Sequence, residues 1–467
     1  TGTMISAMSF LASPGYAFAE DFRYVYPGFV MIFTGFLAMY FIVPLFRKVN
    51  TPSGYEYLEK RFGPWARLYM AFGYLAFNVM RLGVVLYAAS LALHVVLGVD
   101  ILTVMLVLGI VSTFYTMLGG FEAVIWSELL QVVILFAGAA VLVPMALNLV
   151  DGGFLKVVEM GWESGKFSPG SLEFSFMEKT VWMMMISACF STLAEYGTRQ
   201  DFIQRYRAAK SLNHARLAIF VGAVTIVPTW IYFNFLGTSL WAYYEINPDG
   251  YVAQMLLRGT PEEIVPYFIA TQVPNGLRGL VMGGILMATL STLAPMINAC
   301  SVTFMGDFYQ NYIHKKGDAR HYLKASRVCT VLMGVLMFVV ALLINSWRNN
   351  TLQDFSNILA LVLSAGMMGL FFVGFFSTRV SSKAAFTAMA VTVALMVTWL
   401  MLSSPTVQAA HPGLESWVPN LLWACVFSNG FFIVFVLLIA RFFPKPARDL
   451  SDVTWKGVQA QIKKGQD

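Results

Sequence analysis

The feature that most constrains this chain is a series of apolar segments, each long enough to cross a bilayer. About 20 residues of α-helix span the hydrocarbon core, and such runs recur throughout the 467 residues. Only 12% of the residues are charged, about half the fraction typical of soluble proteins. The sequence therefore predicts an all-α polytopic membrane protein with about twelve membrane helices. Their apolar runs lie at residues 2–19, 29–46, 68–97, 101–118, 121–149, 177–197, 217–244, 280–309, 329–346, 358–376, 384–402 and 421–443.

Basic residues gather on one predicted side of the membrane. Of the 31 Lys and Arg residues, 23 lie in alternate loops and in the tail, and loops rich in Lys and Arg stay cytoplasmic. We therefore predict a multi-pass protein of the plasma membrane, with the start of its first helix and its C-terminal tail in the cytoplasm. The bilayer accounts for the net charge of +6, so we expect no nucleic-acid partner.

Cysteine and histidine spacings give no sign of a metal centre. The four cysteines lie in apolar runs at unrelated spacings, and the five histidines lie at or near loops. The spans contain no recognisable set of nucleophile and base, so we do not expect an enzyme.

The first apolar run contains a motif that is unfavourable for a continuous helix. Proline removes a backbone donor and glycine relaxes the chain, so Ser13, Pro14 and Gly15 predict a break in the helix. Backbone carbonyls freed there could bind a cation, and the hydroxyls of Ser6 and Ser9 lie about one turn apart before the break. The alternative is a simple proline kink.

A second polar interruption occurs in the sixth run, at residues 195–198. The first and sixth runs each open a set of five spans, and their starts are separated by five spans, an odd number, so the two sets have opposite orientations. Interrupted helices at matching positions of inverted halves are typical of secondary transporters with a site near the midplane.

Three stretches carry a specific family resemblance. YTMLGGFEAVIWSELLQVVILFAG at residues 115–138 resembles the hallmark segment of the sodium:solute symporter family, which includes symporters of glucose, proline, pantothenate and sialic acid. Residues 197–211 and 288–309 resemble two further segments of that family, in the same order. The resemblance implies the leucine-transporter-type fold, with two inverted five-helix repeats. The implied divisions are residues 1–149 for the first repeat, 150–176 for an extracellular loop, 177–377 for the second repeat, 378–443 for two additional helices and 444–467 for a cytoplasmic tail.

The resemblance also implies a sodium site between the first and eighth helices. Carried over by position, its ligands are backbone carbonyls of Gly2, Ile5 and Ala288 and the hydroxyls of Ser291 and Thr292. Several neutral oxygens suit a hard cation and bury no extra charge. Taken alone, Ser and Thr in a membrane helix more often hydrogen-bond to the preceding turn.

A second sodium site, present in some sialic acid symporters, is not expected here. The matching positions hold Glu128, Ala294 and Pro295, so two of the required oxygens are missing. Glu128 keeps either a structural or a proton-related role, or is a carboxylate near the interface.

Arg81 is the single charge deep inside the third run. It lies about 20 Å into the span, where an unpaired guanidinium costs at least about 2.5 kcal/mol. Its partner is either Glu195 or the carboxylate of a solute, and the sialic acid symporters resembled here bind their substrate through an arginine at this position. We expect Ser6, Ser9, Tyr196, Asn78 and Asn357 to line the same substrate site.

Together these features predict a monomeric sodium-coupled symporter that imports a small polar solute by alternating access, with a carboxylate such as sialic acid as the first candidate. A neutral sugar, an amino acid or a monocarboxylate is the alternative substrate. The alternative function is a symporter-like sensor domain.

Overall fold

The computed structural model describes residues 7–48, 54–347, 366–446, 450 and 453–455. In this part of the chain, helices and loops account for the whole fold apart from one isolated bridge between Ser171 and Thr180. The first half contains α1 (Ala7–Ala19), α2 (Tyr26–Leu37), η2 (Ala38–Ile42), α3 (Val43–Lys48), α4 (Gly54–Phe62), α5 (Pro64–Leu97), α6 (Ile101–Asn148), α7 (Gly153–Glu163), α8 (Val181–Thr198), α9 (Gln200–Ala208) and α10 (Leu212–Ile246). The second half contains α11 (Gly250–Leu257), η3 (Pro261–Glu263), α12 (Ile264–Gln272), α13 (Asn275–Phe304), η4 (Met305–Ile313), α14 (Ala319–Trp347), α16 (Met367–Phe376), α17 (Ser382–Leu402), α18 (Pro405–Ala410), η5 (Leu414–Ser416), η6 (Leu421–Trp423) and α19 (Ala424–Ile439).

Nine helical segments of the described chain are long and apolar enough to cross a membrane. They coincide with nine of the twelve predicted spans. The other three predicted spans correspond to α1, α8 and α16, which are described over 13, 18 and 10 residues.

Helix α6 contains two of the predicted spans. Its 48 residues run through the Gly119-Gly120 pair, yet the hydroxyl of Tyr115 donates to Ser127 Oγ. In a straight helix these residues would lie about 18 Å apart, beyond the reach of the two side chains. The chain therefore doubles back between them, as two separate spans require.

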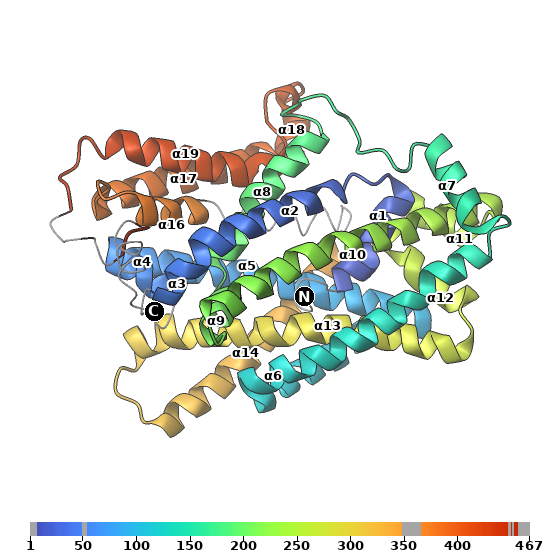
Figure 1. Ribbon diagram of the computed structural model, residues 1–467, viewed down its shortest axis with the longest axis horizontal. Helices are drawn as coiled ribbons and strands as arrows, with labels where there is room; N and C mark the ends of the chain where they lie inside the picture. The colour runs from blue at the N-terminus through green and yellow to red at the C-terminus, as the bar shows by residue number, and fades with distance from the viewer. Residues whose placement is uncertain (1–6, 49–53, 348–365, 447–449, 451–452, 456–467) are drawn as a thin grey trace.

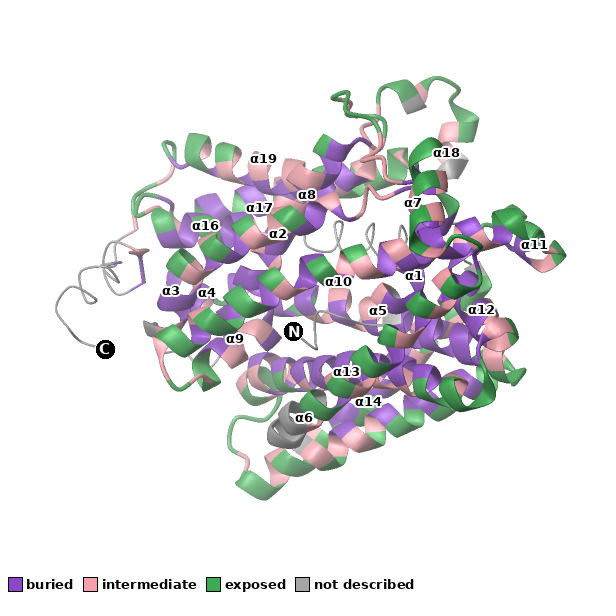
Figure 2. Cartoon of the chain, turned by 45° about the vertical axis from the view of Figure 1, so that its right-hand side comes forward, coloured by how far each residue is buried: buried purple, intermediate pink, exposed green. Residues whose placement is uncertain are grey.

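Two helices form the centre of the bundle. Of the most apolar 18 residues of each span, 67% are buried in α5 and 72% in the span formed by α13 and η4, against 22–50% in the other seven spans. Helices α16, α17 and α19 group on one side of the molecule, while α6, α13 and α14 group on the opposite side (Figure 1). Buried residues accordingly concentrate along the middle of the bundle (Figure 2).

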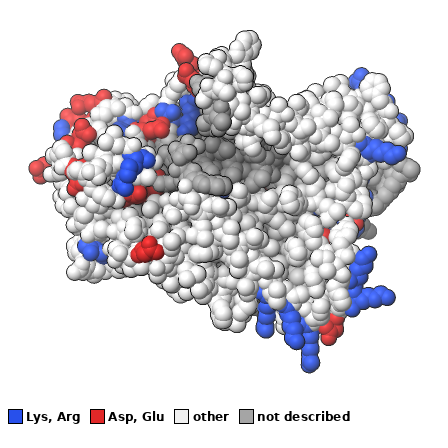
Figure 3. Space-filling view, turned by 180° about the vertical axis from the view of Figure 1, so that it is seen from behind, with Lys and Arg blue, Asp and Glu red and all other residues white. Residues whose placement is uncertain are grey.

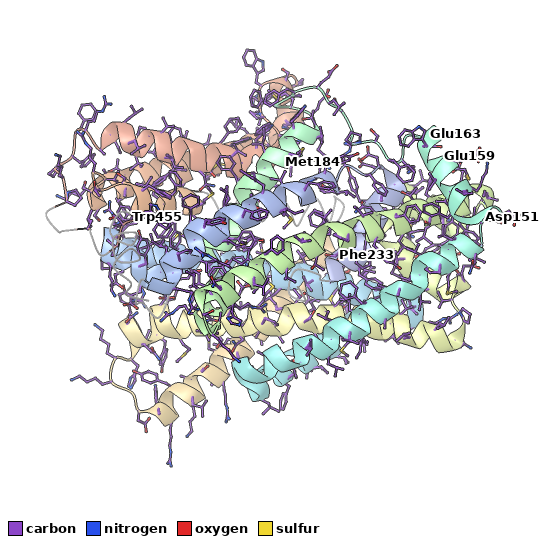
Figure 4. The ribbon with its side chains drawn as sticks, in the orientation of Figure 1. Asp151, Glu159, Glu163, Met184, Phe233 and Trp455 are labelled. Carbon is purple, nitrogen blue, oxygen red and sulfur yellow. The ribbon has the colours of Figure 1, made fainter. Side chains whose placement is uncertain are left out.

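The predicted break at Ser13, Pro14 and Gly15 is wrong: α1 continues through Pro14 to Ala19. Close packing explains the glycine better than unwinding does. A Cβ on Gly15 would lie 2.6 Å from the Pro261 carbonyl oxygen, so the absence of a side chain lets α1 touch the backbone of η3. On the other side, Phe233 of α10 packs against Phe10, with ring centroids 5.1 Å apart (Figure 4).

The second predicted interruption is wrong in position: residues 195–198 all belong to α8, and the chain turns only at Arg199. Helix α8 ends at Thr198, Arg199 is extended (φ −80°, ψ 123°), and α9 begins at Gln200. This change of direction brings the carboxylates and guanidinium groups of α8 and α9 toward the centre of the bundle, where α5 passes.

Candidate functional site

The centre of the candidate substrate site is an ion pair between α5 and α8. Nη1 of Arg81 lies 3.2 Å from Oε1 of Glu195, and the two side chains are 26% and 33% exposed. The structure thus places Arg81 beside the acid predicted from the sequence. Because both side chains are partly exposed, a small anion could reach the guanidinium.

Glu195 has a second cationic partner that the sequence analysis missed. Arg199 donates from Nη1 to the same Oε1 at 3.1 Å. It also donates from Nε and Nη2 to the two carboxylate oxygens of Asp201, at 3.0 and 2.8 Å. Burial alone would raise the pKa of Asp201, but the Arg199 guanidinium holds it below its usual range. The arginine and aspartate two residues apart, directly after a span, were the available signal.

The resulting cluster is electrically balanced. Arg81 and Arg199 carry two positive charges, and Glu195 and Asp201 carry two negative ones. Tyr74, two turns before Arg81 on α5, lies with its hydroxyl 3.4 Å from Asp201 Oδ1. Glu195 can therefore keep a cationic partner when Arg81 turns to another anion.

Asn78 lies between Tyr74 and Arg81 on the same face of α5. The residue is fully buried, and its Nδ2 donates to the Tyr74 carbonyl at 2.8 Å. Its Oδ1 has no hydrogen-bond partner within the described part of the chain. A buried amide oxygen without a partner is costly, so Asn78 fits the predicted role of a group that binds solute.

The remaining predicted substrate residues are less closely associated with Arg81. Tyr196 is 1% exposed, and its hydroxyl lies beside Gly35 of α2 rather than in the ion cluster. Ser9 is half-buried in the first turn of α1, a helix that contacts α5. Ser6 and Asn357 lie outside the described residues.

Three of the predicted sodium ligands converge on α13. The Ala288 carbonyl accepts hydrogen bonds from Ser291 Oγ at 3.0 Å and from Thr292 Oγ1 at 3.1 Å. All three residues are at most 1% exposed. The hydroxyls thus bond to the preceding turn, the alternative considered above, and this holds three oxygens within one small volume.

The rest of the predicted ion site is described only in part. Helix α1 contacts α13, as a site shared between them requires, but Gly2 and Ile5 lie outside the described residues. Ala294 and Pro295 are buried within α13. Glu128 belongs to α6, and its side chain lies outside the described part.

A central helix with a partly exposed arginine thus packs beside a helix with clustered neutral oxygens, within a bundle of helices long and apolar enough to cross a membrane. The chain matches the sodium:solute symporter family over residues 1–392 and belongs to that family. It is accordingly a sodium-coupled symporter, as the sequence predicted, and not an enzyme.

Individual relatives are distant but cover most of the chain. The sodium/sialic acid symporters NanT of Aliivibrio fischeri and SiaT of Proteus mirabilis are each 28% identical, over 85% and 82% of this chain and 77% of their own lengths. The human sodium-coupled monocarboxylate transporter 1 is also 28% identical, over 80% of this chain and 61% of its own length.

Solved structures confirm the leucine-transporter-type fold. The substrate-bound, outward-open structure of a Na⁺-coupled sialic acid symporter superposes with a TM-score of 0.82 at 25% identity, covering 95% of this chain and 88% of that one. Mhp1, a nucleobase-cation-symport-1 family transporter, superposes with a TM-score of 0.59 at 13% identity, covering 97% of this chain and 93% of that one.

Proposed function

We propose that this symporter imports a small carboxylate solute with sodium, and that sialic acid is the first substrate to test. The observation that carries the proposal is that Glu195 has two arginine partners. Arg81 contacts Oε1 of this acid through one nitrogen, and Arg199 contacts the same oxygen through a second guanidinium. A solute carboxylate can therefore take the bidentate fork of Arg81 without leaving Glu195 unpaired.

Charge balance supplies a physical reason for coupling. The cluster of two arginines and two acids is neutral when empty, so a bound carboxylate leaves one negative charge in the bundle. A sodium ion at Ala288, Ser291 and Thr292 would compensate that charge, because unbalanced charge inside a membrane is costly. We propose one sodium per solute, which makes transport of a monoanion electroneutral.

The relatives narrow the choice of solutes. Two are sodium/sialic acid symporters and one is a sodium-coupled monocarboxylate transporter, and both substrate types carry the carboxylate that Arg81 would bind. A neutral sugar does not. We also propose a monomer in the plasma membrane, with the start of its first helix and its C-terminal tail in the cytoplasm, and the repeat boundaries given above.

The test is uptake of labelled N-acetylneuraminate into proteoliposomes, driven by an inward sodium gradient. We expect uptake that disappears when potassium replaces sodium and that excess unlabelled N-acetylneuraminate abolishes. Sodium-driven uptake of labelled lactate without uptake of N-acetylneuraminate would favour a monocarboxylate. Sodium-driven uptake of a labelled neutral sugar alone would contradict the carboxylate proposal.

A further inference from the structure

The turn between α13 and α14 carries an unusual density of free positive charge. Five basic residues fall within 13 positions, and all five side chains are exposed. None of these five side chains has a hydrogen bond or ion pair with any residue that the structure describes. These residues, called the basic turn below, are Lys315, Lys316, Arg320, Lys324 and Arg327.

The other two strongly basic segments differ in this respect. Arg47 donates to the carbonyls of Tyr206 and Ala209 at 2.6 and 2.8 Å, and Arg61 donates to two carbonyls near the start of α17. Arg216 donates to the Met39 carbonyl at 3.1 Å. Cations there hold the helix ends together, so a general excess of basic residues does not explain the basic turn.

The geometry of the basic turn concentrates the charge. Arg320, Lys324 and Arg327 follow the i, i+4, i+7 spacing that places them on one face of α14. Like charges at such spacings repel and destabilise a helix. A polyanionic partner would reduce this repulsion and so stabilise α14. Figure 3 shows Lys and Arg side chains projecting together from the end of the molecule where α14 begins. Three acids, Asp151, Glu159 and Glu163, lie at the far end of the long axis (Figure 4).

Apolar side chains adjoin the cations. Ile313 is 63% exposed just before them, and Leu323 and Val328 are 55% and 60% exposed between and beyond them. From Val328 onward, exposed apolar residues continue along α14, a predicted span. The basic turn thus lies at the junction between a lipid-facing surface and water.

Local hydrogen bonds hold the turn in one shape. The Tyr322 hydroxyl donates to the His314 carbonyl at 2.9 Å and accepts from the Gly317 amide at 3.0 Å. His321 Nε2 lies 3.0 Å from the Tyr309 hydroxyl, and its backbone amide donates to Asp318. The cations therefore form a preorganised array rather than a loose tail.

We propose that the basic turn binds the phosphate headgroups of anionic phospholipids, with the acyl chains against the exposed apolar face of α14. Lys and Arg near a membrane surface each contribute about a fivefold gain in affinity for anionic lipid. The interaction is independent of the transported solute.

The test uses the purified full chain in a neutral detergent, titrated with phosphatidylglycerol or with phosphatidylcholine of the same acyl chains, and followed by thermal unfolding. We expect phosphatidylglycerol to stabilise the protein at concentrations where phosphatidylcholine does not, and salt to weaken the effect. The variant K315Q/K316Q/R320Q/K324Q/R327Q should lose this selectivity.

Two further variants make the result specific. A control with the same charge change at dispersed exposed positions, R207Q/K210Q/R379Q/K383Q/R441Q, should keep the selectivity. The double variant K315Q/K316Q leaves α14 untouched and should weaken the apparent affinity for phosphatidylglycerol about fivefold for each lysine that contacts a headgroup. Equal losses in the dispersed control, unchanged affinity in the double variant, or equal stabilisation by inorganic phosphate would overturn the proposal.

Discussion

Two arginines on α5, about four turns apart, meet very different surroundings. Arg67 is 11% exposed and pairs with Asp307 and Glu59, both at 2.6 Å, and it also donates to the Gly306 carbonyl at 3.1 Å. Arg81 is 26% exposed, and Glu195 at 3.2 Å is its one ion-pair partner among the described residues.

The proposed function requires one of these ion pairs to be structural and the other to be replaceable by a solute. Arg67 has short contacts to three groups, and Asp307 is 1% exposed, so removing either partner would leave a buried charge unpaired. Arg81 shares its acid with Arg199, and its remaining donors have no partner among the described residues. We therefore expect a fixed cross-link at one end of α5 and a replaceable contact near its middle.

The largest effect is expected at the cross-link. Asp307→Asn removes the charge that faces Arg67, and breaking a buried pair costs about 3 to 5 kcal/mol. We expect a markedly lower unfolding temperature and lower yield. Glu159→Gln, in the exposed pair with Lys156, is the control and should change little. An unfolding temperature equal to that of the control would refute the structural role of the Arg67 pair.

The sodium site should behave like Arg81 and unlike Arg67. Replacing Ser291 and Thr292 together with Ala removes two oxygens, and hydrogen-bond-type contacts to a charge are each worth about 1.5 to 3 kcal/mol. The sodium concentration for half-maximal uptake should rise at least about tenfold at similar protein stability. Thr289→Ala is the matched control, since Thr289 bonds to the preceding turn of the same helix. Unchanged sodium dependence would remove the assignment.

Lys166 is another buried cation, and it donates to backbone carbonyls rather than to a carboxylate. Its Nζ donates to the carbonyls of Phe18 and Glu20 at 2.7 and 2.9 Å, at the C-terminal end of α1. Burial lowers the pKa of Lys166 from 10.5 to about 8.

Between pH 8 and 10.5 the unfolded chain therefore binds one more proton at this residue, so the free energy of unfolding rises with pH. We expect a gain of about 1 kcal/mol between pH 8 and 9. Chemical unfolding at both pH values would measure the gain, and Lys166→Met should lack it. The same slope in both proteins would show that Lys166 is not the group responsible.

A smaller effect than that of Asp307→Asn is expected at Glu195. Glu195→Gln removes the acid that competes for Arg81, leaves Arg199 paired with Asp201 and keeps an amide oxygen beside Arg81, so the loss of stability should be smaller than that caused by Asp307→Asn. Affinity for an anionic solute should stay the same or increase. A loss of stability as large as that of Asp307→Asn would mean that both pairs are structural.

The sequence predicted those features that depend on local pattern. Hydrophobic runs located the spans, the end of the sixth run lay one residue from the end of α8, and a lone charge in an apolar run identified Arg81 and its partner Glu195. Each follows from short-range constraints on a helix in lipid.

Features that depend on packing between distant segments were not predicted. Arg67 and Asp307 are 240 residues apart, and no spacing rule joins them. Pro14 and Gly15 predict a broken helix from the sequence alone. In the structure, Gly15 instead allows the backbone of η3 to pack closely against α1. The joint contact of Arg199 with Glu195 and Asp201 likewise depends on the turn of the chain between α8 and α9.

The most direct test of the account is solute binding to Arg81→Lys. This change keeps the charge and removes the bidentate fork. We expect the dissociation constant of N-acetylneuraminate, measured by calorimetry in sodium, to rise about 5- to 150-fold, equivalent to 1 to 3 kcal/mol, at an unchanged unfolding temperature. Arg258→Lys, in the surface pair with Glu263, should bind normally. Undiminished affinity of a stable Arg81→Lys protein would contradict carboxylate binding by Arg81.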